Sequence, residues 1–498
     1  MTDKAPPSVL ADYPVGQRPG AWDEAVCRDG GVLRVREAYR PLLATLGGTT
    51  APDLVARADG LARAHTERGV TFRHDGAQRT FHLDPFPRVL RAGEWSALAA
   101  GLAQRVRALE AFLGDVYSDQ QIVADGVVPA HLVASCPEFR PDLVGVAPPT
   151  GVRVHVAGID VVRDGAGVLR VLEDNLRCPS GATYAVENRR AMQREFPDLF
   201  AQHSVTPLGD YGALLGRVLR GAAGPDVTDP VVVLLTAGPD SPAWAEHCLL
   251  ARWAGLPLAR DSDLVVRGTS VFLRGSGGDA GRRVHVVYRR VDDEDLDPLE
   301  PRGDPARGVP GLMAAVRAGG VVLANAAGNG VADDKGVYTC VPDMVRYYLG
   351  ESPLLPNVET ARCWVAQERA DALDRMAELV FKPVQGYGGK GIVFGPEATT
   401  DQLATLRADV LADPRGWVAQ PLLDLSTVPT LVGDALVPRP VDLRPFLLND
   451  GTSTSVLPGG LTRVALPADS LLVNSSQGGG SKDTWVLAED PVTPPVRA

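Results

Sequence analysis

The chain has 498 residues, enough for two or three domains that each bury a core. Its hydrophobic fraction of 45% and charged fraction of 22% are typical of a globular protein, and its net charge of −11 argues against nucleic acid as a partner. The sequence has no apolar run long enough to span a bilayer, and residues 1–20 lack the hydrophobic core of a signal peptide, so we expect a cytoplasmic protein without a membrane partner.

Six cysteines are scattered along the chain without a C-x-x-C pair. This spacing does not fit a zinc site or a dithiol redox motif. We interpret the cysteines as free thiols in a reducing compartment.

The first part of the chain is predicted to be helical. Residues 1–20 are rich in Pro and Gly and should be loosely ordered, and residues 21–150 form a mostly helical region. Within it, residues 94–113 repeat apolar side chains at intervals of three and four positions, which predicts one long helix with a single apolar face. These apolar positions are Trp95, Leu98, Leu102, Val106, Leu109 and Leu113.

Residues 151–205 change to short β runs. Two runs, 152–156 and 168–172, are separated by the glycine-rich turn 163–167, which predicts a hairpin. We expect Asp160 on the first arm and the carboxylate–amide cluster 173–177 at the end of the second. The side chains of the two arms should then converge.

The cluster carries ligands suited to magnesium. Glu173 and Asn175 are two residues apart and therefore point to the same side of a strand, while Asp174 points to the other. Asp160 lies 13 residues before Glu173 (173 − 160), across the hairpin. Carboxylate and amide oxygens are hard ligands, and Arg177 is placed to reach a phosphate. The alternative is an Asp–Asn pair that simply ends a strand and begins a turn.

Residues 206–330 alternate between strands and helices, which predicts an inserted parallel α/β layer. The predicted order is strand 230–235, helix 243–254, strand 263–266, strand 284–288, helix 311–318 and strand 321–324.

Residues 331–487 carry a lysine and glycine loop, and residues 488–498 form a Pro-rich tail. Lys382 ends a predicted strand, a second strand follows at 391–394, and glycines crowd the turn between them. Unhindered backbone N–H groups and one ammonium suit a triphosphate, although a plain β-hairpin is the alternative. The pattern fits neither a P-loop nor a Rossmann turn. The glycines are Gly386, Gly388, Gly389 and Gly391.

The order of the two motifs is reversed relative to the usual ATP-grasp ligases, because the metal cluster precedes the glycine loop by about 200 residues. Residues 171–181 resemble the signature of circularly permuted ATP-grasp proteins. Further segments that resemble this family are 86–88, 104–105, 289–293, 333–335, 441–446, 458–464 and 474–485. The resemblance runs from about residue 70 to residue 487. It implies an α/β (α+β) class with a circularly permuted ATP-grasp fold, an inserted parallel α/β substrate-binding layer and a helical N-terminal region.

The arrangement is also similar to glutathionylspermidine synthetase and eukaryotic glutathione synthetase. That resemblance implies ATP and Mg²⁺ as cofactors, with residues 151–205 as the metal-binding part and residues 331–487 as the nucleotide-binding part. The implied magnesium ligands are Asp160, Glu173 and Asn175. The implied ATP contacts are Lys335, Lys382, the loop glycines Gly386, Gly388 and Gly389, and Gln420 at the adenine hinge. Lys482 has a counterpart in the downstream lysine of those ligases and, with Arg177 and Arg444, is a catalytic candidate.

Four further residues are candidates for substrate binding. Arg289 and Arg463 carry planar forks that match a carboxylate, although each is equally suited to a structural ion pair, as is Arg444. Ser180 belongs to the signature segment, and Asn474 lies in a polar, glycine-rich turn that we expect to face phosphate or substrate, with a plain surface loop as the alternative.

The sequence therefore predicts an ATP-dependent carboxylate–amine ligase that forms an amide through an acyl phosphate. Its partners would be a small-molecule or peptide carboxylate and an amine acceptor. Two alternatives stay open: an inactive nucleotide-binding or scaffold protein, and a phosphotransferase that uses the same ATP cradle. The amidase activity of the relatives has no matching motif around Cys27 or Cys136. The sequence indicates neither the substrates nor the oligomeric state.

Overall fold

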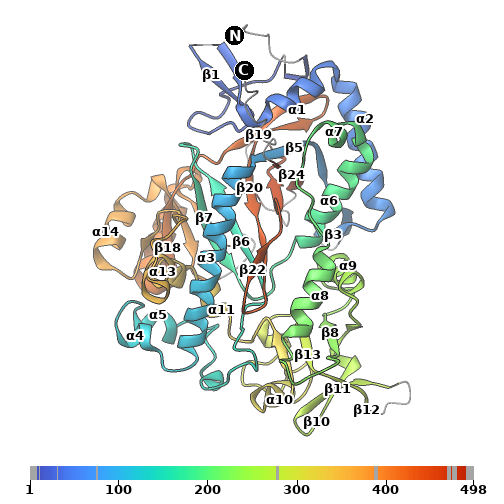
Figure 1. Ribbon diagram of the computed structural model, residues 1–498. Coiled ribbons are helices and arrows are strands. Elements are labelled where there is room, and N and C mark those ends of the chain that lie inside the picture. Colours follow the sequence, from blue (N-terminus) through green and yellow to red (C-terminus); the bar gives the residue numbers. More distant parts are fainter. Residues whose placement is uncertain are drawn as a thin grey trace, which may run out of the picture.

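A computed structural model describes residues 8–10, 12–30, 32–74, 77–275, 280–385, 391–467, 473 and 479–488, and the statements below concern these residues. Strands, helices and loops alternate along the chain, which confirms the predicted mixed α/β class. In Figure 1 the longest sheet runs through the middle of the molecule.

The central sheet has nine strands among the described residues. Its order is β22-β21-β6-β20-β23-β24-β5, with β7 paired to β6 and β19 paired to β20. Neighbouring strands are antiparallel except for β24 and β5, which are parallel. The strands are β5 (Leu83–Arg91), β6 (Val156–Arg163), β7 (Leu169–Asn175), β19 (Thr427–Val432), β20 (Ala435–Arg444), β21 (Phe446–Asn449), β22 (Thr454–Val456), β23 (Leu461–Val464) and β24 (Gly480–Leu487).

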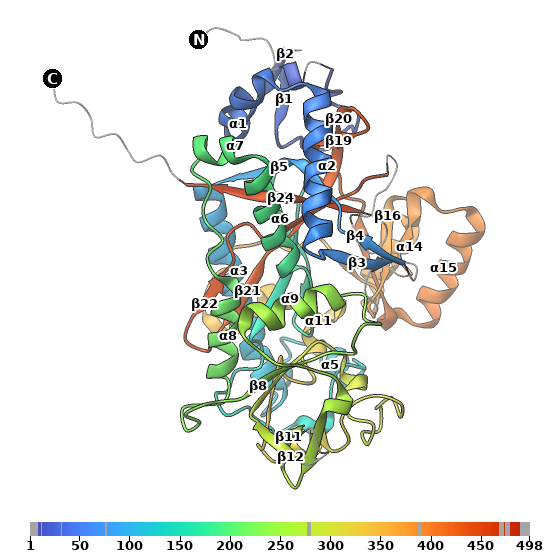
Figure 2. The same ribbon diagram turned by 90° about the vertical axis from the view of Figure 1, so that its right-hand side faces the viewer.

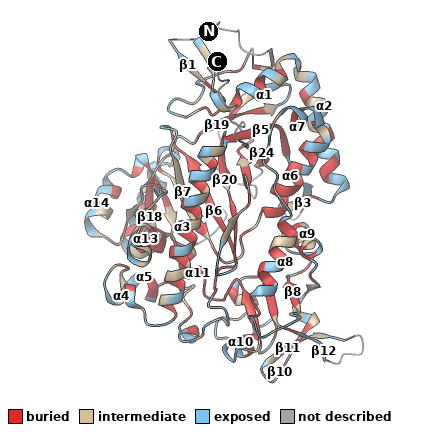
Figure 3. Ribbon diagram, viewed as in Figure 1, coloured by how far each residue is buried: buried red, intermediate tan, exposed pale blue. Residues whose placement is uncertain are grey.

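Two long helices cover opposite faces of this sheet. Helix α3 (Ala92–Val116) shares a core with Ile159 and Leu443, so it lies on one face. Helix α6 (Ala182–Glu195) hydrogen-bonds from Asn188 to Ser481 of β24 and lies on the other. Figure 3 shows the sheet between them as a largely buried layer. The apolar repeat at 94–113 correctly predicted α3, which is two residues longer at its start and three at its end.

The N-terminal region combines helices with strands. Helices α1 (Arg40–Thr45) and α2 (Ala51–Glu67) pack beside the central sheet, and β5 belongs to that sheet. The region also contains two hairpins, β1 (Val26–Asp29) with β2 (Val32–Val35) and β3 (Thr71–His74) with β4 (Ala77–Thr80). No helix of the described part of the chain is long and apolar enough to cross a membrane.

The chain from α8 (Tyr211–Gly221) to α11 (Gly330–Asp333) forms a layer built on a four-stranded parallel sheet. Its strand order is β14-β13-β8-β9. These strands are β8 (Val232–Leu235), β9 (Leu258–Ala259), β13 (Val286–Arg289) and β14 (Val322–Ala324). Helices α9 (Trp244–Ala254) and α10 (Leu312–Arg317) belong to the same layer. The layer lies at one end of the molecule (Figure 1).

One strand predicted for this layer is misplaced. The segment predicted at 263–266 is β10 (Leu264–Arg267), which pairs antiparallel with β11 (Ser270–Arg274) in a separate sheet completed by β12 (Ala280–Val284). The parallel neighbours of β8 are β13 and, at the edge of the sheet, the two-residue strand β9. A two-residue strand carries no periodic pattern, so the sequence assigned its place to the longer apolar run.

The predicted strand at 152–156 is also wrong, because β6 begins only at Val156. The backbone N–H groups of Arg153 and Val154 donate to the Glu110 carboxylate, and that of His155 donates to Asn325 Oδ1. Side chains from distant elements therefore take the hydrogen bonds that a neighbouring strand would make.

A third body projects from the molecule, as Figure 2 shows. It contains the antiparallel sheet β15-β18-β16-β17 with helices α14 (Ala366–Asp374) and α15 (Thr400–Ala412). The strands are β15 (Ala361–Arg362), β16 (Leu379–Pro383), β17 (Val393–Phe394) and β18 (Trp417–Pro421). The sequence correctly predicted β16, β17 and β18, with small differences at their ends.

Candidate active site

The hairpin of β6 and β7 brings the three predicted metal ligands to one face of the central sheet. Asp160 lies opposite Glu173 in the strand register, and Gly158 lies opposite Asn175. Because side chains alternate along a strand, Asp160, Glu173 and Asn175 share the face that α6 covers, and Asp174 points to the α3 face.

Asp160 is held by two arginines from neighbouring strands. Arg444 donates from Nε and Nη2 to the two carboxylate oxygens, with 2.7 Å between Nη2 and Oδ2. Arg463 donates from Nη2 to Oδ2 at 2.8 Å and also contacts Asp442. The Asp160 side chain is only 1% exposed, so its charge is compensated inside the protein.

The two carboxyl groups of the hairpin differ in their electrostatics. Burial alone would raise the pKa of Asp160, but Arg444 and Arg463 hold that pKa well below its usual range. Desolvation raises the pKa of Glu173, and the Asp160 carboxylate raises it further. The Glu173 side chain is 38% exposed and lies 3.6 Å from Arg444. Glu173 is therefore the accessible carboxylate of the pair, and a nearby cation would favour its ionised form.

Two lysines approach Glu173 from other parts of the chain. Lys382 is the second-last residue of β16. Lys335 is the first residue of α12 (Lys335–Tyr338) and follows the capping residue Asp334. The Lys335 ammonium interacts electrostatically with Glu173. The Lys382 ammonium interacts with both Glu173 and Lys335. Desolvation lowers the pKa of Lys382 to about 8, and Lys335 contributes in the same direction. The fold thus brings both predicted phosphate-binding lysines close to the predicted metal ligands.

The ligand set fits a magnesium ion that is shared with a nucleotide. Among the described residues no group of three or more His, Cys, Asp or Glu forms a metal cluster. An ion here would depend on Glu173, the Asn175 amide and oxygens of the nucleotide, which is the usual pattern for Mg²⁺. The Asn175 amide nitrogen is buried without a partner, and a half-turn of the amide would place its oxygen at that position.

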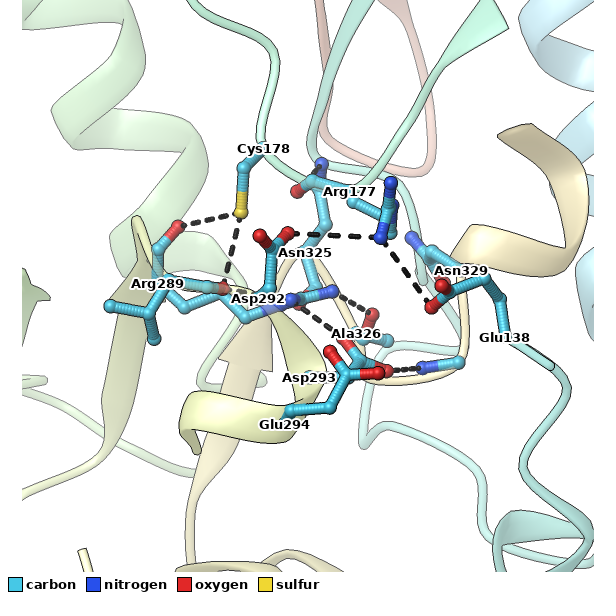
Figure 4. Close-up of polar contacts among 12 residues, drawn as sticks. Glu138, Arg177, Cys178, Arg289, Asp292, Asp293, Glu294, Asn325, Ala326 and Asn329 are labelled. Carbon is cyan, nitrogen blue, oxygen red and sulfur yellow. Dashed lines mark hydrogen bonds and ion pairs between the residues drawn. The ribbon is translucent and has the colours of Figure 1, made fainter. Parts of the chain in front are cut away.

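Arg177 lies among carboxylates at the junction with the parallel layer (Figure 4). Its Nε donates to Asp333 at 3.1 Å, and its Nη1 lies 3.4 Å from Glu138 and 3.7 Å from Asp292. Burial raises the pKa of Asp333 to about 7 despite this contact with Arg177. The Arg177 side chain is 20% exposed. It therefore remains accessible while three acidic residues compete for it.

Arg289, a predicted substrate contact, is fully buried in this region (Figure 4). Its guanidinium donates to the backbone oxygens of Asn325 at 2.9 Å and Ala326 at 3.1 Å, and it pairs with Asp293 at 2.7 Å. These contacts join β13 to the segment after β14. The Arg289 guanidinium is therefore taken up by protein partners, in a position that supports the parallel layer.

Lys482, a predicted catalytic residue, lies on the other face of the central sheet from Arg463. Lys482 pairs with Thr462 in the register of β23 and β24, so it points away from the side of Arg463. Its ammonium contacts Asp84 and the backbone oxygens of Phe86 and Pro429, and its side chain is fully buried. The structure does not bring Lys482 to the cluster.

Ser180 lies beside the cluster but has a partner in the parallel layer. Its hydroxyl contacts Glu246 of α9, which also accepts from the Gly181 N–H at 2.7 Å. The Ser180 backbone oxygen accepts from Arg444 Nη1 at 3.3 Å. Ser180 thus connects the start of α6 to Arg444.

Gln420 lies in β18 opposite Val380, two residues from Lys382 along β16. Its side-chain amide donates to Thr360 Oγ1 at 2.9 Å. The predicted nucleotide loop glycines Gly386, Gly388 and Gly389 and the predicted substrate contact Asn474 lie outside the described residues.

Two acidic residues at the site were not among the predicted site residues. Asp442 binds Arg463, and Asp333 binds Arg177. Asp442 precedes Arg444 by two positions in a strand. This spacing places both side chains on one face and could have indicated Asp442 from the sequence. Asp333 lies two residues before Lys335, in the segment 333–335 that resembles the family, and that resemblance was its only signal.

Comparisons with known proteins identify the family. Residues 87–465 match the family model described as circularly permuted ATP-grasp type 2. The chain belongs to the circularly permuted ATP-grasp type 2 family. Membership supports a ligase-type function that uses ATP, and such enzymes generally use Mg²⁺ as well.

Similar proteins come from several bacteria. An uncharacterized protein of Mycobacterium tuberculosis is 55% identical over 91% of this chain and 82% of its own length. One of Synechocystis is 49% identical over 84% of this chain and 88% of its own length. A Frankia alni protein named "Putative glutamate--cysteine ligase 2-3" is 45% identical over 97% of this chain, which spans only 55% of that protein.

A solved structure supports the fold. A glutathione synthetase-like effector from Globodera pallida, in its apo form, aligns with a TM-score of 0.58 at 13% sequence identity. The alignment covers 88% of this chain and 98% of the effector chain. At this identity the similarity shows the shared fold alone.

Proposed function

We propose that the protein is an ATP- and Mg²⁺-dependent carboxylate–amine ligase that forms an amide bond through an acyl phosphate. The observation that carries this proposal is the convergence of Glu173 and Asn175 with Lys335 and Lys382, although the pairs come from separate parts of the chain. A site with hard oxygen ligands and two ammonium groups matches a metal-bound triphosphate.

Each group has a distinct role in this proposal. Glu173 and Asn175 would hold Mg²⁺, which supplies neutralisation of phosphate charge when bound. Lys335 and Lys382 would bind the phosphate oxygens, and the N–H groups of Arg444 that do not face Asp160 would orient the carboxylate substrate. Asp160 is fully engaged with Arg444 and Arg463, so its role is to hold those guanidinium groups in place.

The reaction balances without a nucleophilic side chain. A carboxylate oxygen of the substrate attacks the γ-phosphorus of ATP, and the bond to ADP breaks. The amine nitrogen then attacks the acyl carbon, and inorganic phosphate leaves with the carboxylate oxygen that attacked. The amine loses one proton. Catalysis would depend on orientation and on the cations that neutralise the transferred phosphoryl group.

Isotope transfer tests this proposal directly. Metabolites from a cell extract are labelled with ¹⁸O in their carboxylate groups. They are incubated with the protein, ATP, Mg²⁺ and hydroxylamine, which serves as a general amine acceptor. A ligase of this kind yields a hydroxamate, ADP and phosphate that contains one ¹⁸O. A stable phosphorylated product without free phosphate would identify a phosphotransferase, and ATP binding without turnover would identify an inactive nucleotide-binding protein.

ATP binding should weaken as pH rises above about 8. Lys382 has a pKa of about 8 in the free protein, and bound phosphate would favour its ammonium form. At pH 9 most molecules must take up a proton to bind ATP, so the Kd should rise about tenfold between pH 7 and pH 9. Calorimetric titration in buffers of different ionisation enthalpy measures both the affinity and the proton uptake.

The Lys382→Arg variant is the control for this pH dependence. Its guanidinium stays protonated throughout the range, so its affinity should change little between pH 7 and pH 9. Equal pH profiles for the variant and the wild type would show that Lys382 is not the group that titrates.

A further inference from the structure

Asp174 stands between the two candidate metal ligands and is anchored to helix α3. Its carboxylate oxygens accept from Arg105 Nε at 2.6 Å and Nη2 at 2.7 Å. The Asp174 side chain is 0% exposed and that of Arg105 is 5% exposed. A buried two-point ion pair of this kind fixes orientation as well as distance. Asp174, the middle residue of the segment Glu173–Asn175, is therefore rigidly attached to α3.

The remaining nitrogen of Arg105 connects α3 to the helix that carries Lys335. Arg105 Nη1 donates to Asn357 Oδ1 at 2.8 Å, and Asn357 Nδ2 donates to the Tyr338 backbone oxygen at 3.0 Å. The guanidinium also lies 5.3 Å above the Tyr338 ring. Tyr338 is the last residue of α12, and Lys335 is the first.

Tyr338 closes this network back onto β7. Its hydroxyl donates to the Val171 backbone oxygen at 2.6 Å, two residues before Glu173. The backbone at Asn357 also forms a parallel bridge with Val171. Arg105 thus holds together the strand that carries Glu173 and Asn175 and the helix that carries Lys335.

We infer that Arg105 is a positioning residue that sets the distance between the candidate metal ligands and Lys335. Asp174 points to the α3 face, so an anchor on that face holds Glu173 and Asn175 toward the other face. The inference rests on the proposed ligase function and gives the N-terminal region a role in it. Helix α3 supports the ATP site from behind the strand, without touching the nucleotide.

The Arg105→Lys variant tests this role. Lysine keeps the charge but loses the fork, so it cannot hold both Asp174 oxygens and Asn357 together. The measurement is the gain in ATP affinity that Mg²⁺ provides, taken as the ratio of Kd values in EDTA and in Mg²⁺. We expect this gain to fall about tenfold or more, as is typical when partners of metal ligands are changed.

Arg189→Lys is the matched control. Arg189 of α6 pairs with Asp483 of β24 through 2.8 Å and 3.1 Å contacts, with side chains 5% and 2% exposed. It is as buried as the Arg105 pair and is also an Arg–Asp pair, although Nε alone contacts both oxygens, and it belongs to a different network. This variant should lose a similar amount of thermal stability and keep the wild-type gain from Mg²⁺.

A second variant keeps the test decisive if Arg105→Lys does not fold. The double substitution Arg105→Met with Asp174→Leu removes both charges, so no unpaired charge stays buried. It should fold and lose the gain from Mg²⁺. An unchanged gain in either folded variant, or an equal loss in Arg189→Lys, would overturn the positioning role and leave the ligase proposal standing. A wild-type protein without any gain from Mg²⁺ would overturn both.

Discussion

The Lys382→Ala and Glu173→Ala variants are expected to lose ATP turnover, with kcat lowered on the order of a thousandfold or more. Lys382 would bind phosphate charge and Glu173 would hold the metal, so neither role can be taken over by water in a desolvated site. Release of ADP, measured by a coupled assay or by mass spectrometry, checks both. Turnover at the wild-type rate in either variant would contradict the assignment of the site.

These losses should not come from unfolding. The pKa of Lys382 is lower in the folded protein than its ordinary value, so the charged form opposes folding at neutral pH. Thermal unfolding of Lys382→Ala should therefore begin no earlier than that of the wild type. Arg375→Ala and Glu378→Ala are suitable controls, because these side chains are 61% and 65% exposed just before β16 and should leave turnover unchanged.

The Asp160→Ala variant should be strongly destabilised, more so than Lys382→Ala or Glu173→Ala. Removing this carboxylate leaves Arg444 and Arg463, whose side chains are 14% and 11% exposed, without their shared counter-charge; loss of one partner of a buried pair typically costs about 3–5 kcal/mol. Urea denaturation measures the change in the free energy of unfolding. Substrate orientation should be lost as well, because the Arg444 guanidinium depends on Asp160 for its position.

Two comparisons separate this effect from a general loss of charge. Asp240→Ala removes a carboxylate that is 98% exposed and pairs only loosely with Arg73, so its cost should be below about 1 kcal/mol. Adding Arg444→Met to Asp160→Ala should recover part of the lost stability, because one uncompensated cation is removed. A destabilisation of Asp160→Ala no larger than that of Asp240→Ala would show that the buried pairs contribute little.

Local features of the site could be predicted because they depend on short stretches of sequence. A spacing of two residues places Glu173 and Asn175 on one side of a strand, and a period of three to four residues marks helix α3. The strand that contains Lys382 could be predicted because it, too, depends on a short stretch of sequence. The assignment of these residues to metal and phosphate remains a proposal.

Short strands and loops with distant partners could not be predicted. The segment 152–155 has strand-like residues, yet Glu110 and Asn325 take its backbone hydrogen bonds. The two-residue strand β9 gave no pattern at all. In both regions tertiary contacts decided a structure that local preference alone left open.

The sequence by itself determined which residue types stand at which spacing, and through the resemblance it identified the permuted ATP-grasp family. The tertiary structure decided which charges meet. Asp160 binds Arg444 and Arg463, which lie roughly 300 residues away along the chain, and Asp174 binds Arg105. Lys482, predicted for the site, lies on the opposite face of the sheet from Arg463. Periodicity reports only the direction of a side chain relative to its neighbours in sequence. The partner of a buried charge depends on sheet register and helix packing, which distant segments establish together.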